Sequence, residues 1–206
     1  QYVQLMEEYP KDKRALSAAI DIEGPLNAKA AFAVASTYHA HKRYADSQKR
    51  FQQFIKRFPH DQRVADAYYN LALSQLGLGQ YETAIRTFEK TYEQYGLPSA
   101  LYRIGGVYIT RNNEAEAIAI YERFSRQYPQ HNLADDALWQ AAKSAERNNR
   151  FSEAERLYKL LVSRHPQSTY RDDAGWGIGF TFYCRSEFDK ALHVFERLSK
   201  IAQQPH

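Results

Sequence analysis

The sequence predicts an all-α solenoid built from helix-turn-helix repeats. A similar segment returns about every 37 residues, one position in each copy holds a small residue, and an aromatic residue follows four positions later. The small residues are Ser47, Ala84, Ala117, Ala154 and Ala191, and the aromatic residues are Phe51, Phe88, Tyr121, Tyr158 and Phe195. A fixed period of this size indicates stacked supersecondary units, and it favours a binding surface over a catalytic pocket.

The N-terminal segment 1–26 precedes the first full copy. Tyr2, Leu5 and Pro10 fit the last turns of the second helix of an earlier repeat. Residues 11–26 then form an insertion with room for one short helix. Because the sequence starts within a repeat and begins with Gln1, we expect it to be a piece of a longer protein.

Each copy divides into two helices. In the second copy, Tyr68, Leu71 and Gln75 lie three or four residues apart and form one face of a helix. Gly79 ends that helix, and Ala84 and Phe88 begin the stripe of the next one. The five expected repeats are 27–60, 61–97, 98–130, 131–167 and 168–203.

Turn residues separate the helices in the other copies. Asn112 and Asn149 occupy the place of Gly79, and asparagine is the next best residue for the left-handed conformation. Prolines end the repeats at Pro59, Pro129 and Pro166. The residues expected to cap the following helices are Asp61, Asn132 and Ser168.

Small residues also recur in the middle of each first helix. They are Ala35, Ala72, Gly105, Ala142 and Gly179. A larger side chain at these positions would separate the paired helices and leave voids, so we expect the two helices of each repeat to approach closely here.

The pattern resembles the tetratricopeptide repeat, whose motif is Trp-x2-Leu-Gly-x2-Tyr, then Ala-x3-Phe, then Pro. The third copy reads Leu101, Ile104, Gly105, Tyr108, Ala117, Tyr121 and Pro129. The resemblance implies a right-handed superhelical α-solenoid whose first helices line a concave surface.

The register of this resemblance places a row of aromatic residues on the concave face. They are Phe32, Tyr69, Tyr102, Trp139 and Trp176. The same face carries Asn70, Arg103, Gln140, Lys143, Phe180 and Tyr183. Such a row suits an extended peptide, a partner protein or a glycan strand, because rings supply contact area at small entropic cost. The alternative interpretation is that these rings pack between successive first helices.

Other classes of function find little support in the sequence. The net charge is +4 without a long basic run, so we expect no nucleic-acid partner. No apolar stretch is long enough to span a membrane. His39 and His41 are two apart on a helix and point to different faces, and we expect no metal, cofactor or catalytic residue. The single Cys184 fits a reducing compartment without excluding the periplasm.

Two shorter patterns suggest the bacterial cell envelope. Segments Phe58–Tyr68 and Tyr128–Trp139 begin with an aromatic-Pro pair and continue with closely spaced alanines. They resemble the repeats of outer-membrane assembly lipoproteins and Tol-associated periplasmic proteins. Segment Ala174–Tyr183, followed by Phe188–Ala191, is similar to the superhelical region of soluble lytic murein transglycosylases. The catalytic Glu-Ser pair of those enzymes is absent from the sequence.

The sequence therefore predicts a non-enzymatic scaffold that binds a peptide or protein on its concave face. The alternative is the non-catalytic helical arm of a lytic transglycosylase that acts on peptidoglycan. A third hypothesis is self-association through the open ends of the repeat array. The expected location is the periplasm or cell envelope, with the cytoplasm left open.

Overall fold

The computed structural model describes residues 2–22 and 24–202, and this part of the chain contains twelve helices and no strand. The all-α repeat fold predicted from the period is confirmed. The helices are α1 Tyr2–Glu8, α2 Lys13–Asp21, α3 Ala28–Ala40, α4 Tyr44–Arg57, α5 Val64–Gly77, α6 Tyr81–Tyr95, α7 Pro98–Thr110, α8 Glu114–Gln127, α9 Ala134–Arg147, α10 Phe151–Arg164, α11 Arg171–Cys184 and α12 Phe188–Ala202.

Two helices fall within each of the five expected repeats, and α1 and α2 fall within the N-terminal segment. Gln1 at the start of that segment, Glu23 within it and Gln203 at the end of the last repeat lie outside the described residues. The repeat boundaries themselves stay a prediction.

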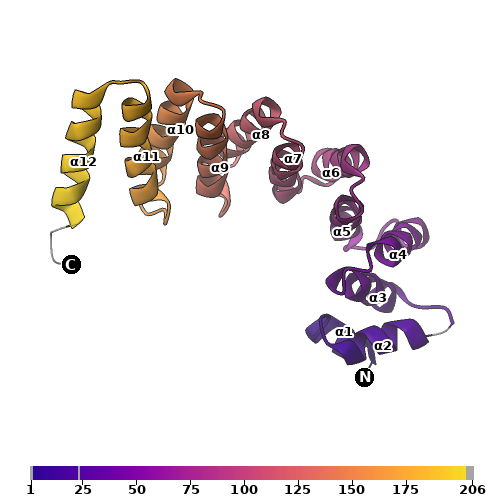
Figure 1. Ribbon diagram of the computed structural model, residues 1–206. Coiled ribbons are helices and arrows are strands. Elements are labelled where there is room, and N and C mark those ends of the chain that lie inside the picture. Colours follow the sequence, from indigo (N-terminus) through magenta and orange to yellow (C-terminus); the bar gives the residue numbers. More distant parts are fainter. Residues whose placement is uncertain (1, 23, 203–206) are drawn as a thin grey trace. The chain divides into compact units, whose positions relative to one another are not determined.

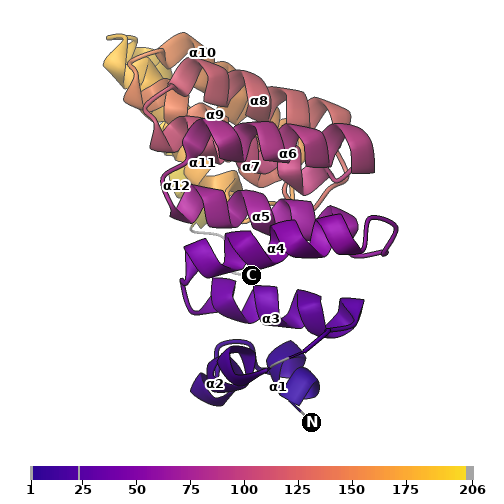
Figure 2. The ribbon, with the colours of Figure 1, turned by 90° about the vertical axis from the view of Figure 1, so that its right-hand side faces the viewer.

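The chain forms two compact units, residues 1–100 and 101–206. In the first unit, α3, α4, α5 and α6 pack in chain order, and α1 and α2 pack against α3 (Figure 1). Figure 2 shows α3, α4 and α5 lying side by side. In the second unit, α8 to α12 follow the same rule, each helix packing on the next.

The core of each unit consists of the small and aromatic residues that set the sequence period. Ser47, Ala84, Ala117, Ala154 and Ala191 are all buried. Of the aromatic residues four positions later, Phe51, Phe88, Tyr121 and Tyr158 are buried, and Phe195 is half-buried. The alanines of the repeats therefore occupy corresponding environments, as the period predicts.

The two helices of a repeat approach closely where glycine stands in place of the small alanine of the first helix. A Cβ atom placed on Gly105 would lie 2.8 Å from the ring of Tyr121, and one on Gly179 would lie 2.5 Å from the ring of Phe195. Atoms that close would overlap, so these two positions require glycine unless the ring moves. The expected close approach of the two helices is confirmed at these repeats.

The turn between the two helices of each repeat uses one left-handed residue. Gly79, Asn112 and Asn149 have φ values of 72°, 54° and 58°. Lys42 and Ser186 take the same conformation at the equivalent positions, with φ values of 58° and 61°. Neither side chain signals this conformation, so the turn geometry there follows from the packing of the flanking helices.

The three expected N-caps are wrong. Helices α5, α9 and α11 begin two or three residues later, at Val64, Ala134 and Arg171, and the residues before them make no side-chain cap hydrogen bond. The polar side chains instead accept hydrogen bonds from backbone amides in the turn before each helix. Asp61 Oδ1 accepts from the Arg63 amide at 2.9 Å, and Ser168 Oγ accepts from the Tyr170 amide at 3.1 Å.

The equivalent turn before α9 uses a different side chain. His131 Nδ1 accepts a hydrogen bond from the Leu133 amide at 3.1 Å, and Asn132 is exposed. Polar side chains therefore stabilise the turns before these helices and do not mark the first residue of each helix.

A substitution at Gly177 on α11 tests the close packing of this helix on Tyr158 in the second unit. A Cβ atom at this position would lie 2.6 Å from the ring of Tyr158, which is fully buried and hydrogen-bonded to Glu146 at 2.7 Å. We expect Gly177→Ala to lower the free energy of unfolding by roughly 1–2 kcal/mol, because overpacking outweighs the better helix propensity of alanine. Urea denaturation followed by circular dichroism measures this.

Gly106→Ala is the matched control, because Gly106 lies in a helix of the same unit and its nearest neighbour would be 3.6 Å from a new Cβ atom. We expect it to leave stability unchanged or raise it by up to about 1 kcal/mol. Equal effects of the two substitutions would contradict the close packing of Gly177 on Tyr158.

Candidate functional site

The aromatic row expected on the first helices packs chiefly against the second helices. Each ring contacts the aromatic residue nineteen positions later, on the second helix of its own repeat. The pairs and their centroid distances are Phe32–Phe51 at 5.6 Å, Tyr69–Phe88 at 5.5 Å, Tyr102–Tyr121 at 5.2 Å, Trp139–Tyr158 at 5.7 Å and Trp176–Phe195 at 6.1 Å. Each ring therefore packs against the core of its own repeat. Four of the five are half-buried, and Trp176 is exposed.

One ring of the row also contacts the following repeat. The ring of Trp139 stacks on Tyr170 at 5.1 Å with an interplanar angle of 11°. Trp139 is therefore enclosed between Tyr158 and Tyr170, and its indole is half-buried. Trp176 holds the equivalent place in the last repeat and is exposed.

The polar candidates mostly bond within their own helices. Asn70 donates to the carbonyl of Asp66 at 2.9 Å. Gln140 lies 3.5 Å from Asp136, and Lys143 forms an ion pair with Glu146. Arg103 is exposed, and its positive charge makes a small contribution that lowers the pKa values of Tyr102 and Tyr121, against the larger effects that raise them. A partner that bound Asn70 or Lys143 would have to displace an existing contact.

The remaining candidates gather on α11 and α12. Trp176 stacks on Phe180 at 5.3 Å and 12°, and Tyr183 contacts Phe188 at 5.6 Å. Leu192 follows Phe188 by one turn of α12. We name these five residues the α11–α12 aromatic patch. Four of them are more than half exposed: Trp176 by 54%, Tyr183 by 58%, Phe188 by 58% and Leu192 by 59%.

The sequence did not assign Phe188 and Leu192 to this surface. Phe188 enters the sequence pattern only as the start of the segment Phe188–Ala191, and Leu192 follows the repeating alanine Ala191 directly. The available signal was that Leu192 stands where the preceding repeat has Glu155, a polar residue. An apolar side chain in place of a polar one, at a position that is not buried, indicates a surface with a different role.

A carboxylate cluster links three successive repeats of the second unit. Asp136 on α9 accepts hydrogen bonds from the hydroxyls of Tyr102 on α7 and, at 2.7 Å, of Tyr170 before α11. Its neighbour Asp135 accepts from Ser168 at 2.7 Å. Both aspartates lie in the first turn of α9, where their negative charges interact favourably with the positive end of the helix dipole.

The pKa values of the tyrosine hydroxyls around this cluster are raised. Burial raises the pKa of Tyr121 to about 12, with the negative charge of Asp136 adding to the effect. The hydrogen bond to Asp136 raises the pKa of Tyr170 to about 12. Burial, followed by the hydrogen bond to Asp136, raises the pKa of Tyr102 well above its usual range. The hydroxyls of Tyr102 and Tyr170 therefore act as neutral donors to Asp136 and connect neighbouring repeats.

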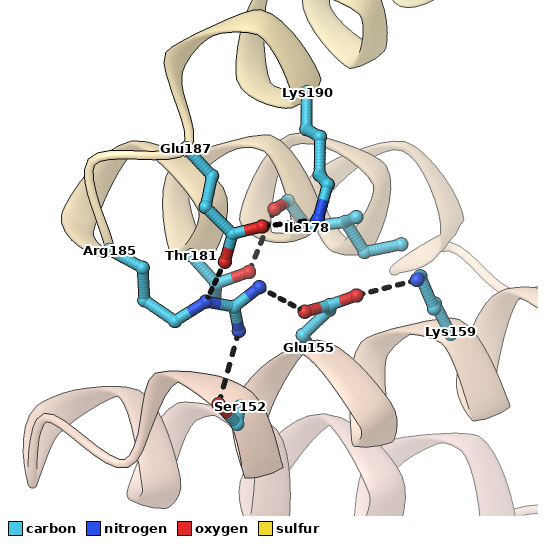
Figure 3. A network of polar contacts seen from close by, with 8 residues as sticks. All are labelled: Ser152, Glu155, Lys159, Ile178, Thr181, Arg185, Glu187 and Lys190. Atoms are coloured by element: carbon cyan, nitrogen blue, oxygen red, sulfur yellow. Dashed lines mark hydrogen bonds and ion pairs between the residues drawn. The ribbon is translucent and has the colours of Figure 1, made fainter.

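Figure 3 shows a second polar network, between α10, α11 and the start of α12. Arg185 donates to Glu155 at 2.5 Å and to Glu187 at 2.6 Å. Lys159 reaches the other oxygen of Glu155 at 2.5 Å, and Lys190 reaches Glu187 at 2.5 Å. Burial opposes ionisation of Glu155, but the hydrogen bonds from Lys159 and Arg185 outweigh it and lower its pKa. This network fixes α12 against α10.

The described residues contain no group of three or more His, Cys, Asp and Glu placed to hold a metal ion. Cys184 is half-buried, and burial raises the pKa of its thiol. In that part of the chain, no helix has the length and apolar character needed to cross a membrane.

The raised tyrosine pKa values predict a loss of stability in alkali. In the unfolded chain a tyrosine ionises near 10.0, whereas Tyr121 and Tyr170 ionise near 12 in the folded state. The folded state therefore binds more protons between these values, and stability falls as the pH rises from about 10 to about 12. We expect the urea midpoint to drop across this window and to drop less in Tyr170→Phe. A midpoint that stays constant up to pH 12 would contradict the assignment.

Comparisons with known proteins agree with this geometry. Two sequence models described as tetratricopeptide repeat match the chain, one over residues 35–95 and 69–132 and the other over residues 136–168. No curated protein matches the sequence. The residues matched by the two models amount to well over half of the chain.

Solved structures share the fold at low sequence identity. The structure "MamA 41-end from Desulfovibrio magneticus RS-1" has a TM-score of 0.61 and 14% identity, with 86% of this chain and 97% of that chain covered. A second MamA structure has a TM-score of 0.63 and 14% identity, covering 84% of this chain and 90% of that chain.

A structure of nearly identical TPR-like repeats from a putative kinesin light chain of Podosopora anserina has a TM-score of 0.61 and 13% identity, covering 89% of this chain and all of that chain. At these identities the likeness establishes the fold alone. With the family matches and the helix pairs described above, it leads to one conclusion: the chain belongs to the tetratricopeptide repeat family.

Proposed function

We propose that this chain is a non-catalytic scaffold that binds a peptide or protein partner through the α11–α12 aromatic patch. The observation that carries the proposal is the exposure of Trp176, Tyr183, Phe188 and Leu192 on two adjacent helices. An exposed group of large apolar side chains of this kind is typical of interaction sites. The family and its related structures support a scaffold, because repeats of this type present surfaces for protein binding.

The geometry of the patch suits a binding site. Trp176 is held by Phe180 and Phe195, and Tyr183 is held by Phe188. Rings that are already fixed lose little conformational freedom when a partner binds, so more of the contact energy appears as affinity. Tryptophan and tyrosine are also the residues most often found at the energetic centre of an interface.

The other aromatic residues of the row are secondary contact points within each unit. Tyr102 and Trp139 offer ring edges in the second unit, and Phe32 and Tyr69 offer them in the first. All four are half-buried by their second-helix partners. We therefore assign them a smaller contribution to binding than the α11–α12 aromatic patch.

The helical arm of a lytic transglycosylase, with a glycan strand as ligand, is the alternative function. It rests on the sequence similarity of Ala174–Tyr183 and Phe188–Ala191. Neither the matched family models nor the structures named above are of that class. A location in the periplasm or cell envelope is likewise a proposal from the sequence. Reading the surrounding gene tests both proposals: a downstream catalytic domain with a Glu-Ser pair supports the arm, and the absence of any export signal argues against the envelope.

Tyr183→Ala tests the scaffold proposal. Peptides selected from a displayed library on the wild-type protein provide the ligands, and fluorescence anisotropy gives their dissociation constants. We expect Tyr183→Ala to weaken binding by roughly thirtyfold, as for an interface residue that contributes about 2 kcal/mol. Tyr9→Ala is the matched control, because Tyr9 is 61% exposed and lies outside the patch.

Equal affinities of the two variants would contradict a role for the patch. Light scattering over a range of concentrations separates partner binding from self-association. A mass that rises with concentration in the wild type, and not in Tyr183→Ala, would show that the patch binds a second copy of the chain.

A further inference from the structure

A cleft of about 360 Å³ lies between α10, α11 and α12, apart from the α11–α12 aromatic patch. Val162 on α10, Ile178 on α11, and Val194 and Leu198 on α12 form its apolar walls. Gly175 lies at one end of the cleft, and Phe182 lies two turns further along α11. Its volume falls within the range of about 300–1,000 Å³ that small-molecule sites occupy.

The preceding repeat shows why this cleft exists. In the repeat register, Gly175 corresponds to Leu138, which is fully buried at the equivalent place on α9. Gly175 lacks that side chain, and Leu198 takes part of the freed space, with its Cδ2 3.0 Å from the place of a Cβ atom; the rest stays open as the cleft. The first repeat supports this rule, because Ala31 at the same register position borders a smaller hollow of about 100 Å³.

The cleft also lacks an ion pair that joins the second helices of the two preceding repeats. There, Arg156 on α10 binds Glu122 on α8 at 2.7 Å and joins the two second helices. The corresponding residues beside the cleft are His193 and Lys159, which cannot form that pair. Two features of the repeat pattern therefore change beside the cleft: Gly175 stands in place of a leucine, and the ion pair between neighbouring second helices is absent.

Two arginines give the Gly175 end of the cleft a positive charge. Arg171 lies one helical turn before Gly175, and Arg197 adjoins Leu198, whose Cδ2 would be 3.0 Å from a Cβ atom on Gly175. Neither arginine forms an ion pair with any described residue. Asp172 is the only acidic residue in the lining.

The cations near Phe182, at the other end of the cleft, already form ion pairs with a glutamate. Lys159 and Arg185 lie 5.4 and 5.1 Å from the ring of Phe182, and both bind Glu155 in the network of Figure 3. The free positive charge of the cleft is therefore confined to Arg171 and Arg197.

We propose that this cleft binds an amphiphilic anion, an apolar chain that ends in a carboxylate or phosphate. The chain lies between Val162, Ile178 and Leu198, where it displaces water from apolar walls. The head group lies at Arg171 and Arg197, because guanidinium groups bind carboxylate and phosphate oxygens with two parallel hydrogen bonds. The distance along α11 from Gly175 to Phe182 is about 10 Å, which accommodates an alkyl chain of medium length. This site is independent of the scaffold function proposed above.

Calorimetric titration with decanoate, decyl phosphate and uncharged decanol, each below its micelle-forming concentration, tests the proposal. We expect both anions to bind saturably with one site per chain, and decanol to bind about tenfold more weakly or not at all. The ratio of the decanoate and decyl phosphate affinities identifies the preferred head group. Equal binding of decanol would overturn the role of the arginines, and no binding of either anion would overturn the site.

Two variants locate the binding. Gly175→Leu restores the side chain found in the preceding repeat, and we expect it to abolish binding of both anions. Arg197→Gln leaves the apolar walls in place, and we expect it to weaken anion binding about tenfold without changing decanol binding. The matched controls are Gly106→Ala, a helix glycine outside the cleft, and Lys200→Gln, an exposed cation outside its lining.

Circular dichroism and thermal unfolding establish that each variant is folded, and Arg197→Gln keeps the test decisive should Gly175→Leu unfold. Wild-type affinity in a folded Gly175→Leu, or in Arg197→Gln, would overturn the proposal. An acidic peptide with an apolar anchor that binds in this cleft while both alkyl anions fail would overturn it as well.

Discussion

The contact between a small residue on each first helix and an aromatic ring on the following helix is the constraint on which the rest of the structure depends. Tyr121 sits against Gly105, and Phe195 sits against Gly179, at distances that leave no room for a Cβ atom. The same rings contact the aromatic residues of the first helices, Tyr102 and Trp176. Each second-helix ring thus fixes both the spacing of its helix pair and the orientation of the first-helix ring.

This constraint also determines which rings remain for binding. A first-helix ring is already covered on one side by its own repeat, and Trp139 is covered on another by Tyr170. The polar contacts of Asp136 extend this order from one repeat to the next, because its carboxylate joins Tyr102 to Tyr170. Most candidate contact residues are therefore part of the packing between helices, whereas Trp176 and Tyr183 on α11 and Phe188 on α12 remain exposed.

The last repeat departs from the common pattern at several positions. Gly175 replaces a buried leucine, Leu192 replaces the ion-pairing Glu155, and His193 replaces Arg156, which forms an ion pair with Glu122. A residue that departs from the repeat pattern weakens the packing of that repeat. Several such departures in one repeat therefore indicate a functional surface. Here they open a cleft on one side of α11 and expose an apolar surface beside it, which gives this repeat two different surfaces for recognition.

The sequence by itself determined the helices, their pairing and the residues of the core. The spacing of Ala84, Ala117, Ala154 and Ala191 was sufficient, because a helix can bury only one face and the same face recurs in every copy. Left-handed turns at Gly79, Asn112 and Asn149 were also predictable, since these residue types favour that conformation. The helix starts were not, because Asp61 and Ser168 satisfy a preceding turn.

Only the tertiary structure decided which candidate residues are available to a partner. Tyr102 and Trp139 look equivalent to Trp176 in the sequence, but the first two are enclosed by residues from neighbouring helices and the third is exposed. The bridge from Asp136 to two tyrosines joins residues 34 positions apart, and the cleft at Gly175 likewise brings together residues from three different helices. Local periodicity specifies which face of a helix turns inward, whereas the coverage of any one side chain depends on what the next helix places against it.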